Sequence, residues 1–122
     1  MKRIFFIIFT FIHILCCCTE QGKENNKEIT LSNNNIYFFY YNQCPYCHDA
    51  INYINSQYPD LKLTMINIHT PEGYKLLVKC AKKYNLYPNI GTPLFAIGDH
   101  YIMGWSDSNA KKLDKYIKPF LK

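Results

Sequence analysis

Two cysteines separated by two residues carry the clearest chemical signal in this sequence. Cys44 and Cys47 stand in the run Cys-Pro-Tyr-Cys, after an apolar stretch and at the start of a segment whose apolar residues have helical spacing. A helix N-terminus presents free N–H groups and a positive dipole end, which stabilise a thiolate and lower the pKa of the first cysteine. The second cysteine can then attack the mixed disulfide and release the product. The pattern therefore predicts a redox pair in which Cys44 attacks and Cys47 resolves.

The residues around the pair are expected to tune its reactivity. Pro45 stiffens the turn and lacks an N–H, Tyr46 offers a flat aromatic surface, and His48 adds positive charge near the helix start. A zinc site is disfavoured, because it needs about four ligands and the sequence has neither a second Cys-x-x-Cys nor a His-x-x-x-His. A purely structural disulfide is disfavoured as well, since the pair opens a helix behind a buried strand.

Hydrophobic patterns predict the elements that must position the pair. Expected strands cover residues 36–41, 61–68, 93–97 and 100–103, and expected helices cover 45–57, 70–85 and a last segment that Asp107 or Ser108 caps and that ends at Leu121. A helix joins the first two strands, so they are parallel, and a Gly-Asp hairpin signal joins the last two. The order β-α-β-α-β-β-α indicates an α/β protein with a mixed four-stranded sheet flanked by helices.

This order and the motif together resemble the thioredoxin superfamily over residues 36–122. In that family the proline before the third core strand is cis and packs beside the redox pair, and Gly91-Thr92-Pro93 has the matching place here. The resemblance implies a thioredoxin-like fold and a redox-active disulfide between Cys44 and Cys47. It also implies that Thr92 and Pro93 shape a substrate groove and offer backbone groups to an extended peptide.

Two branches of the superfamily match the details. Cys-Pro-Tyr-Cys is the usual glutaredoxin motif, and residues 102–107 resemble the glutaredoxin segment that holds glutathione, which implies substrate-binding roles for Gly104 and Asp107. This chain has Met103 where that segment normally has its first glycine. The Gly-Thr-Pro run, the hairpin and the Gly-aromatic pair are also similar to the catalytic domains of periplasmic disulfide isomerases. Glutathione thus stays open as a co-substrate, and no other cofactor is expected.

The N-terminal segment has the features of an export signal. Two basic residues precede an apolar run over residues 4–15, which is shorter than the roughly 20 helical residues that span a bilayer. The run Leu-Cys-Cys-Cys that follows resembles the bacterial lipobox. This resemblance implies that Cys18 is lipidated, with Cys17 as the alternative register. We therefore expect a membrane-anchored lipoprotein that faces the periplasm or the cell exterior.

The chain divides accordingly into a lipoprotein-type signal peptide (1–17), a flexible polar tether (18–35) and one redox domain (36–122). The six cysteines are clustered instead of being spread along the 122 residues, which excludes a disulfide-dense miniprotein. Cys80 stands alone on the apolar face of the second expected helix. We expect it to be a buried free thiol.

The amino-acid composition limits the classes of partner that this protein can bind. The net charge is +5, and 12 basic and 9 acidic residues remain when residues 1–17 are set aside, which is too weak and too scattered a balance for nucleic acid. We expect a monomer that exchanges disulfides with protein substrates and with an upstream redox partner. Oxidase, reductase and isomerase directions stay open, because two intervening residues constrain a reduction potential only loosely.

An alternative of a different class is a metal-delivery module without enzymatic activity. In that hypothesis Cys44 and Cys47 bind Cu(I), and His100 and Met103 near the hairpin are candidate further ligands. Thiolates and thioethers are the soft ligands that Cu(I) prefers. Tight Cu(I) binding without disulfide exchange would favour this hypothesis.

Overall fold

The computed structural model describes residues 30–121, and the expected signal peptide, Cys17 and Cys18 lie outside them. The elements are β1 (Ile36–Tyr40), α1 (Pro45–Gln57), β2 (Thr64–Asn67), α2 (Pro71–Lys83), β3 (Leu94–Ile97), β4 (His100–Met103), α3 (Asp107–Tyr116) and a short 3-10 helix, η1 (Lys118–Phe120). This order confirms the predicted β-α-β-α-β-β-α arrangement. None of the helices in residues 30–121 has the length and apolar character needed to cross a membrane.

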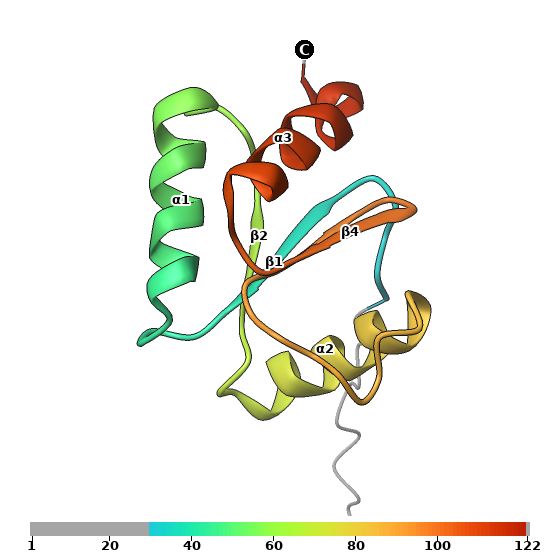
Figure 1. The fold of residues 1–122 in the computed structure, drawn as a ribbon. Coiled ribbons are helices and arrows are strands. Elements are labelled where there is room, and N and C mark those ends of the chain that lie inside the picture. Colours follow the sequence, from blue (N-terminus) through green and yellow to red (C-terminus); the bar gives the residue numbers. More distant parts are fainter. Residues whose placement is uncertain (1–29, 122) are drawn as a thin grey trace, which may run out of the picture.

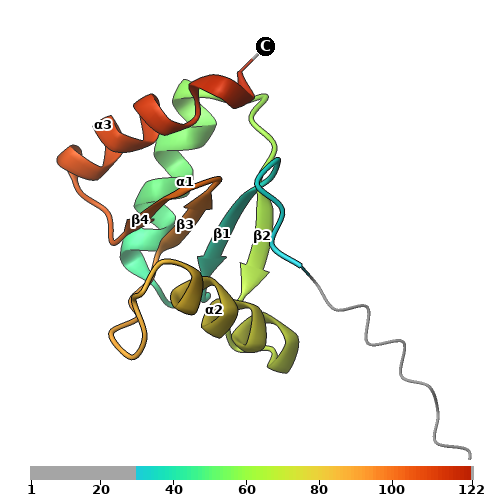
Figure 2. The same ribbon diagram turned by 90° about the vertical axis from the view of Figure 1, so that its right-hand side faces the viewer.

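The four strands form one mixed sheet in the order β2-β1-β3-β4. β1 runs parallel to β2 and antiparallel to β3, and β3 and β4 form the predicted antiparallel hairpin. Helices α1 and α3 cover one face of the sheet and α2 covers the other (Figures 1 and 2). The loop from β1 to α1 therefore leaves the centre of the sheet, where two neighbouring strands hold its starting point.

The continuous apolar sequence of β1 follows from this central place. Ile36 and Phe38 face a core cluster that includes residues of α1 and α3, whereas Tyr37 and Phe39 face a second cluster with α2. Alternate side chains of a strand point to opposite faces, so a strand covered on both sides needs apolar residues at every position. Phe38 packs against Phe95 of β3, with 4.6 Å between the ring centroids.

Helix α2 begins at a tight junction with β2. The Thr70 hydroxyl accepts a hydrogen bond from the Gly73 N–H at 3.0 Å and donates one to the Asn67 carbonyl at 2.9 Å. Gly73 is buried against this turn, and a Cβ atom there would overlap the Asn67 carbonyl and lie 2.7 Å from Thr70 Oγ1. The close approach of α2 to the end of β2 therefore requires a residue without a side chain.

Two tyrosines join α1 to α3 through one carboxylate. The hydroxyls of Tyr53 and Tyr58 donate to Asp114 Oδ1 at 2.8 and 2.7 Å. The hydrogen bond of Tyr58 to this carboxylate, together with burial, raises the pKa of Tyr58 to about 12. The two helices that share one face of the sheet are thus tied by polar contacts in addition to their apolar packing.

Several predicted boundaries were wrong. β2 covers only Thr64–Asn67, because this is the stretch that pairs with β1. Ser106 caps α3 instead of Asp107 or Ser108, and its hydroxyl accepts from the Asn109 N–H at 3.1 Å. The last helix ends at Tyr116, and η1 follows it because Pro119 has no N–H with which to continue an α-helix.

The end of the expected tether packs on the domain. Leu31 packs against the second core cluster, and the Ser32 N–H donates to the Tyr37 hydroxyl at 2.9 Å. Lys83 Nζ donates to Asn33 Oδ1 at 2.7 Å. The boundary predicted at residue 35 therefore lies too late, because contacts with β1 and α2 order residues 30–35.

Cys80 is a fully buried free thiol, as predicted. Burial raises its pKa from 9.0 to about 12, and the charge of Lys83 lowers it to a lesser extent. Since the folded pKa lies above the unfolded one, the neutral thiol contributes stability that is complete below about pH 9 and is lost as the pH rises towards 12.

We expect the free energy of unfolding to fall between about pH 9 and pH 11, and to fall less steeply in Cys80→Ala. Urea denaturation at a series of pH values measures both slopes. The cavity that the alanine leaves lowers stability equally at every pH, so the comparison of slopes is unaffected by it. Equal slopes in the two proteins would contradict the prediction.

Candidate active site

Cys44 occupies the N-cap of α1, the position where serine, threonine or aspartate usually stands. Its sulfur accepts a hydrogen bond from the Cys47 N–H at 3.2 Å, so the sulfur caps the helix in place of the usual side-chain oxygen. Pro45 follows as the first helical residue, where its missing N–H leaves no hydrogen bond unmade. The helix start therefore presents both its dipole and one N–H donor to Cys44 Sγ.

Cys44 and Cys47 form a disulfide, with their Cα atoms 5.2 Å apart. Both residues belong to the core cluster between the sheet and the helices α1 and α3. Only 2% of Cys44 and 3% of Cys47 is exposed. A substrate must therefore fit closely against the surrounding loops to reach a sulfur atom, and those loops determine which substrates can do so.

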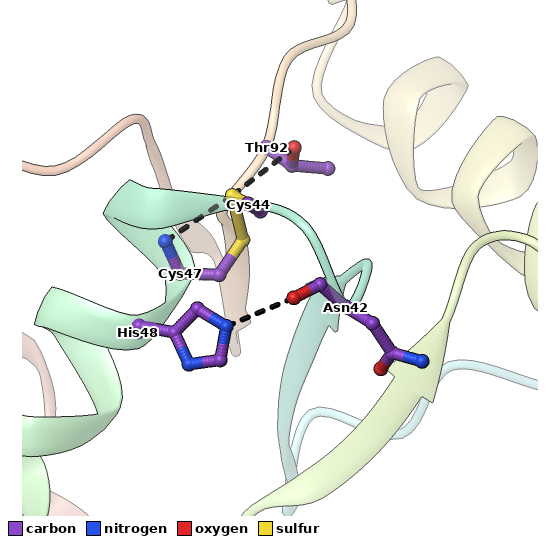
Figure 3. Close-up of a disulfide and its surroundings, with 5 residues drawn as sticks. All are labelled: Asn42, Cys44, Cys47, His48 and Thr92. Carbon is purple, nitrogen blue, oxygen red and sulfur yellow. Dashed lines mark hydrogen bonds between the residues drawn. A yellow bond between two sulfur atoms is a disulfide. The ribbon is translucent and has the colours of Figure 1, made fainter.

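The loop before β3 contacts the disulfide directly. The Thr92 hydroxyl lies 3.7 Å from Cys44 Sγ and donates to it, because a disulfide sulfur carries no hydrogen (Figure 3). The peptide bond between Thr92 and Pro93 is cis, in agreement with the resemblance, and Pro93 is buried. Within residues 30–121, no hydrogen bond occupies the backbone N–H or C=O of Thr92. Thr92 therefore has a free donor and a free acceptor beside the sulfur atoms.

The remaining predicted tuning residues have different surroundings. Tyr46 is 60% exposed and extends the surface next to the disulfide. The His48 ring points back at the loop before Cys44, where its Nε2 lies 2.9 Å from the Asn42 carbonyl and donates to it (Figure 3). The Cys44 N–H donates to the Tyr41 carbonyl at 3.2 Å. Hydrogen bonds at Tyr41 and Asn42 thus hold the turn that leads into the redox pair.

The segment between β4 and α3 reaches the same loop. The Gly104 N–H donates to the Pro93 carbonyl at 2.8 Å, so the structure brings these two predicted residues together. Asp107 is exposed at the first position of α3, and no hydrogen bond among residues 30–121 joins its side chain to the cysteines. Its substrate-binding role stays a prediction.

Sequence reasoning missed two sets of contacts in this region, those of the Met103 and Asn109 side chains. Met103 Sδ accepts a hydrogen bond from the Gly91 N–H at 3.2 Å. The Asn109 side chain donates from Nδ2 to the carbonyls of Met103 and Gly104, at 3.2 and 3.0 Å. The position of Asn109 three residues after the cap Ser106 was the available signal, since that spacing often carries a side chain that reaches back. No sequence pattern pairs Met103 with Gly91.

The two candidate copper ligands of the hairpin do not lie together. Met103 stands at the end of β4 opposite Leu94, whereas His100 stands at the far end of the hairpin and stacks on Tyr116, with 4.1 Å between ring centroids. Three residues of a strand separate two positions by roughly 10 Å. Among the described residues, no three His, Cys, Asp or Glu side chains come close enough together to hold a metal ion.

A hollow of about 800 Å³ lies elsewhere on the molecule. The loop between α1 and β2 and residues 119–121 line it, and Ile36 borders it at the beginning of β1. Cys44 follows the other end of β1, so the hollow is separate from the candidate active site.

Comparison with solved structures places the fold. The crystal structure of the glutaredoxin grx-1 from Archaeoglobus fulgidus is similar over 69% of this chain and 86% of that chain, with a TM-score of 0.54 and 18% sequence identity. The fold is thioredoxin-like. No protein-family model and no curated protein sequence matches the chain. The thioredoxin-like fold, with a disulfide of Cys-x-x-Cys spacing at the N-terminus of α1, supports a thiol–disulfide oxidoreductase.

Proposed function

We propose that this protein is an exported, membrane-tethered thiol–disulfide oxidoreductase that acts on protein substrates through Cys44 and Cys47. The observation that carries the proposal is the disulfide at the N-terminus of α1, where Cys44 Sγ caps the helix and accepts the Cys47 N–H. The contact between Thr92 and Cys44 Sγ adds a second polar group at the same atom. Two donors at one sulfur favour its charged form once the disulfide is reduced.

The exchange proceeds in two steps in the direction of substrate reduction. The Cys44 thiolate attacks one sulfur of the substrate disulfide, a mixed disulfide forms, and the other substrate sulfur leaves as a thiolate that takes up a proton. The Cys47 thiol then loses its proton and attacks Cys44 Sγ, which closes the Cys44–Cys47 disulfide and releases the second substrate thiol. Two electrons pass from the cysteine pair to the substrate, and oxidation of a substrate is the same sequence reversed.

An extended polypeptide is the substrate form that the geometry supports. The free N–H and C=O of Thr92 can pair with a peptide backbone in the manner of an added strand. Tyr46, exposed beside the disulfide, supplies apolar contact area. No metal or organic cofactor takes part in this scheme. The protein acts as a monomer, and an upstream redox partner returns its cysteine pair to the starting oxidation state after each exchange.

The Cys47→Ser variant tests the proposal directly. Its Cys44 can still attack a substrate disulfide, but no thiol is present to resolve the product, so mixed disulfides with substrate proteins should accumulate. Non-reducing electrophoresis of the variant, followed by reduction, shows them as bands that collapse to the free chain. Cys80→Ser is the matched control and should trap nothing, because Cys47 is still present to resolve the mixed disulfide. Absence of any trapped protein with Cys47→Ser would contradict the resolving role.

The direction of exchange follows from the reduction potential of the Cys44–Cys47 pair. Equilibration with glutathione at several ratios of its thiol and disulfide forms measures this potential. A value near −120 mV identifies a strong oxidant and a value near −270 mV a reductant, on the scale of known dithiol proteins.

Membrane attachment is proposed from the N-terminal sequence, with Cys18 as the lipidated residue. Cells that express the full chain with labelled palmitate should incorporate the label. We expect Cys18→Ser to lose the label and Cys17→Ser to keep it. The opposite pattern would shift the lipidated position to Cys17, and label in neither the native chain nor the variants would contradict lipid attachment.

A further inference from the structure

The outward side of α2 carries a stripe of basic side chains. Lys75, Lys79 and Lys82 are exposed and stand four and three residues apart, a spacing that places them on one side of a helix. From Gly73 to Gly98 the sequence contains four lysines and no aspartate or glutamate. This surface of the domain is therefore positively charged along the helix.

Exposed aromatic side chains accompany the lysines. Tyr74 is 56% exposed, and Tyr87, just after the helix, is 57% exposed. Lys82 Nζ lies 6.0 Å from the centroid of the Tyr87 ring, so these two side chains share one surface. Tyrosine and lysine suit the boundary between a bilayer and water, because the ring and the lysine stem are apolar while the hydroxyl and the ammonium stay hydrated. We call the three lysines and two tyrosines, Tyr74, Lys75, Lys79, Lys82 and Tyr87, the α2 face.

The described chain begins on the same side of the sheet. Leu31 packs against the core cluster that α2 covers, and Asn33 Oδ1 accepts from Lys83 Nζ at the end of the helix (Figure 1). Thr30 comes twelve positions after Cys18, the proposed lipidated residue, and a chain of that length spans at most about 40 Å. The anchor therefore keeps the α2 side within reach of the bilayer.

The other lysine-rich helix is less suited to a negative surface. α3 carries three lysines and two aspartates, which leaves +1, whereas α2 carries four lysines and one glutamate, which leaves +3. α3 also covers the opposite face of the sheet, because Leu113 belongs to the other core cluster. The charge and the place where the chain enters the domain thus favour the same helix.

We propose that the α2 face docks on a membrane surface of anionic lipid headgroups. The inference rests on the proposed membrane tether and adds which side of the domain faces the bilayer. The tether keeps this face close to the lipid and so raises the effective concentration of headgroups, which makes a few lysines sufficient for docking. Cys44 and Cys47 belong to the core cluster on the other face of the sheet, so docking does not cover the redox pair.

The first experiment measures contact between the α2 face and lipid in the full chain. Tyr74→Trp places an indole on this face, and brominated lipids quench its fluorescence on contact. Trp105, the one natural tryptophan, packs against Tyr53 and Phe95 on the other side of the sheet and supplies the background. We expect stronger quenching in phosphatidylcholine vesicles that contain anionic phosphatidylglycerol than in phosphatidylcholine alone. High salt should remove the difference, because it screens exposed charges. Equal quenching in the two kinds of vesicle overturns the proposal.

Charge variants show which helix makes the contact. Two triple variants, each made in the Tyr74→Trp chain, remove three charges from one helix. They are Lys75→Gln with Lys79→Gln and Lys82→Gln on α2, and Lys111→Gln with Lys112→Gln and Lys115→Gln on α3. The α2 variant should lower the ratio of docked to undocked domain roughly hundredfold, about fivefold per lysine. The α3 variant is the matched control and should change it less than about fivefold. An equal loss in both indicates attraction by net charge alone and overturns the proposal.

Flotation separates the docking from the tether. A full chain that stays in solution with phosphatidylcholine vesicles contradicts the tether, and quenching by an excess of phosphatidylglycerol vesicles still supports docking in that case. A chain that floats with both kinds of vesicle and is quenched equally in both keeps the tether and overturns docking. Polyglutamate is the probe for an acidic protein as the partner. Binding of polyglutamate to the α2 face without binding of anionic vesicles overturns the proposal.

Discussion

Cys44→Ser is expected to reduce the rate of insulin disulfide reduction to that of the uncatalysed reaction, a loss of at least about a thousandfold. The serine hydroxyl keeps the N-cap geometry and can accept the Cys47 N–H, so the helix start should persist. It cannot form a disulfide with the substrate, which removes the first chemical step. Turbidity of reduced insulin chains, with dithiothreitol as the electron source, measures the rate.

One companion variant and one stability measurement make this result specific to the reacting sulfur. Cys80→Ser leaves Cys44 and Cys47 in place and should retain most activity once corrected for the folded fraction. Thermal denaturation of Cys44→Ser should show a cooperative transition, which separates lost chemistry from lost structure. A folded Cys44→Ser protein with activity close to the native chain would overturn the assignment of Cys44 as the nucleophile.

Gly73→Ala is expected to destabilise the protein by about 2 kcal/mol, although alanine is the better helix former. Helix propensity alone favours alanine by roughly 1 kcal/mol. The new Cβ would overlap the Asn67 carbonyl and press on the Thr70 hydroxyl, and backbone atoms cannot move aside as a flexible side chain can. Overpacking of this kind costs about 1–3 kcal/mol or more, so the clash outweighs the propensity. The midpoint of thermal unfolding should fall by roughly 10 °C.

Gly91→Ala is the matched control for this change. A Cβ at Gly91 meets only Met103 atoms at 3.7 Å, which is ordinary van der Waals contact. Its unfolding midpoint should stay within a few degrees of the native value. If Gly73→Ala were as stable as Gly91→Ala, α2 would have room at its junction with β2, and the close approach described above would be wrong.

The elements that carry the reaction were predictable because their signals are local. β1 is a continuous run of apolar residues, and α1 begins with a proline in its first turn. Both signals depend only on residues that are close together in the sequence. The helix-start position of Cys44 follows from these two facts. The pairing of Thr92 with Cys44, 48 residues apart, was reached only through a family resemblance, since nothing in the spacing of the two residues indicates contact.

The parts that could not be predicted depend on side chains that meet across the fold. In the sequence, Asp114 is an ordinary acidic residue on the face of a helix. In the structure, its carboxylate accepts hydrogen bonds from the hydroxyls of Tyr53 and Tyr58 in and just after α1. The sequence indicates that Met103 is a strand residue or a candidate copper ligand. In the structure, its sulfur accepts a hydrogen bond from the Gly91 N–H. Both contacts require the relative placement of distant segments, which periodicity does not supply. The boundary between tether and domain was predicted too far along the chain for the same reason, because Asn33 contacts Lys83 of α2, which is distant in the sequence.

The ordered residues before β1 also determine how the domain responds to a mechanical load. A pull on the chain at Thr30 acts on the Thr30 carbonyl, which accepts from the Tyr37 hydroxyl at 3.5 Å, and on the Leu31 packing before it reaches the Ser32 and Asn33 contacts with Tyr37 and Lys83. These contacts can open one after another, whereas β1 lies between two partner strands and would have to shear from both. The contacts before β1 should therefore open at lower force than the sheet, and the disulfide, which lies beyond the far end of β1, is not part of the segment that is loaded first.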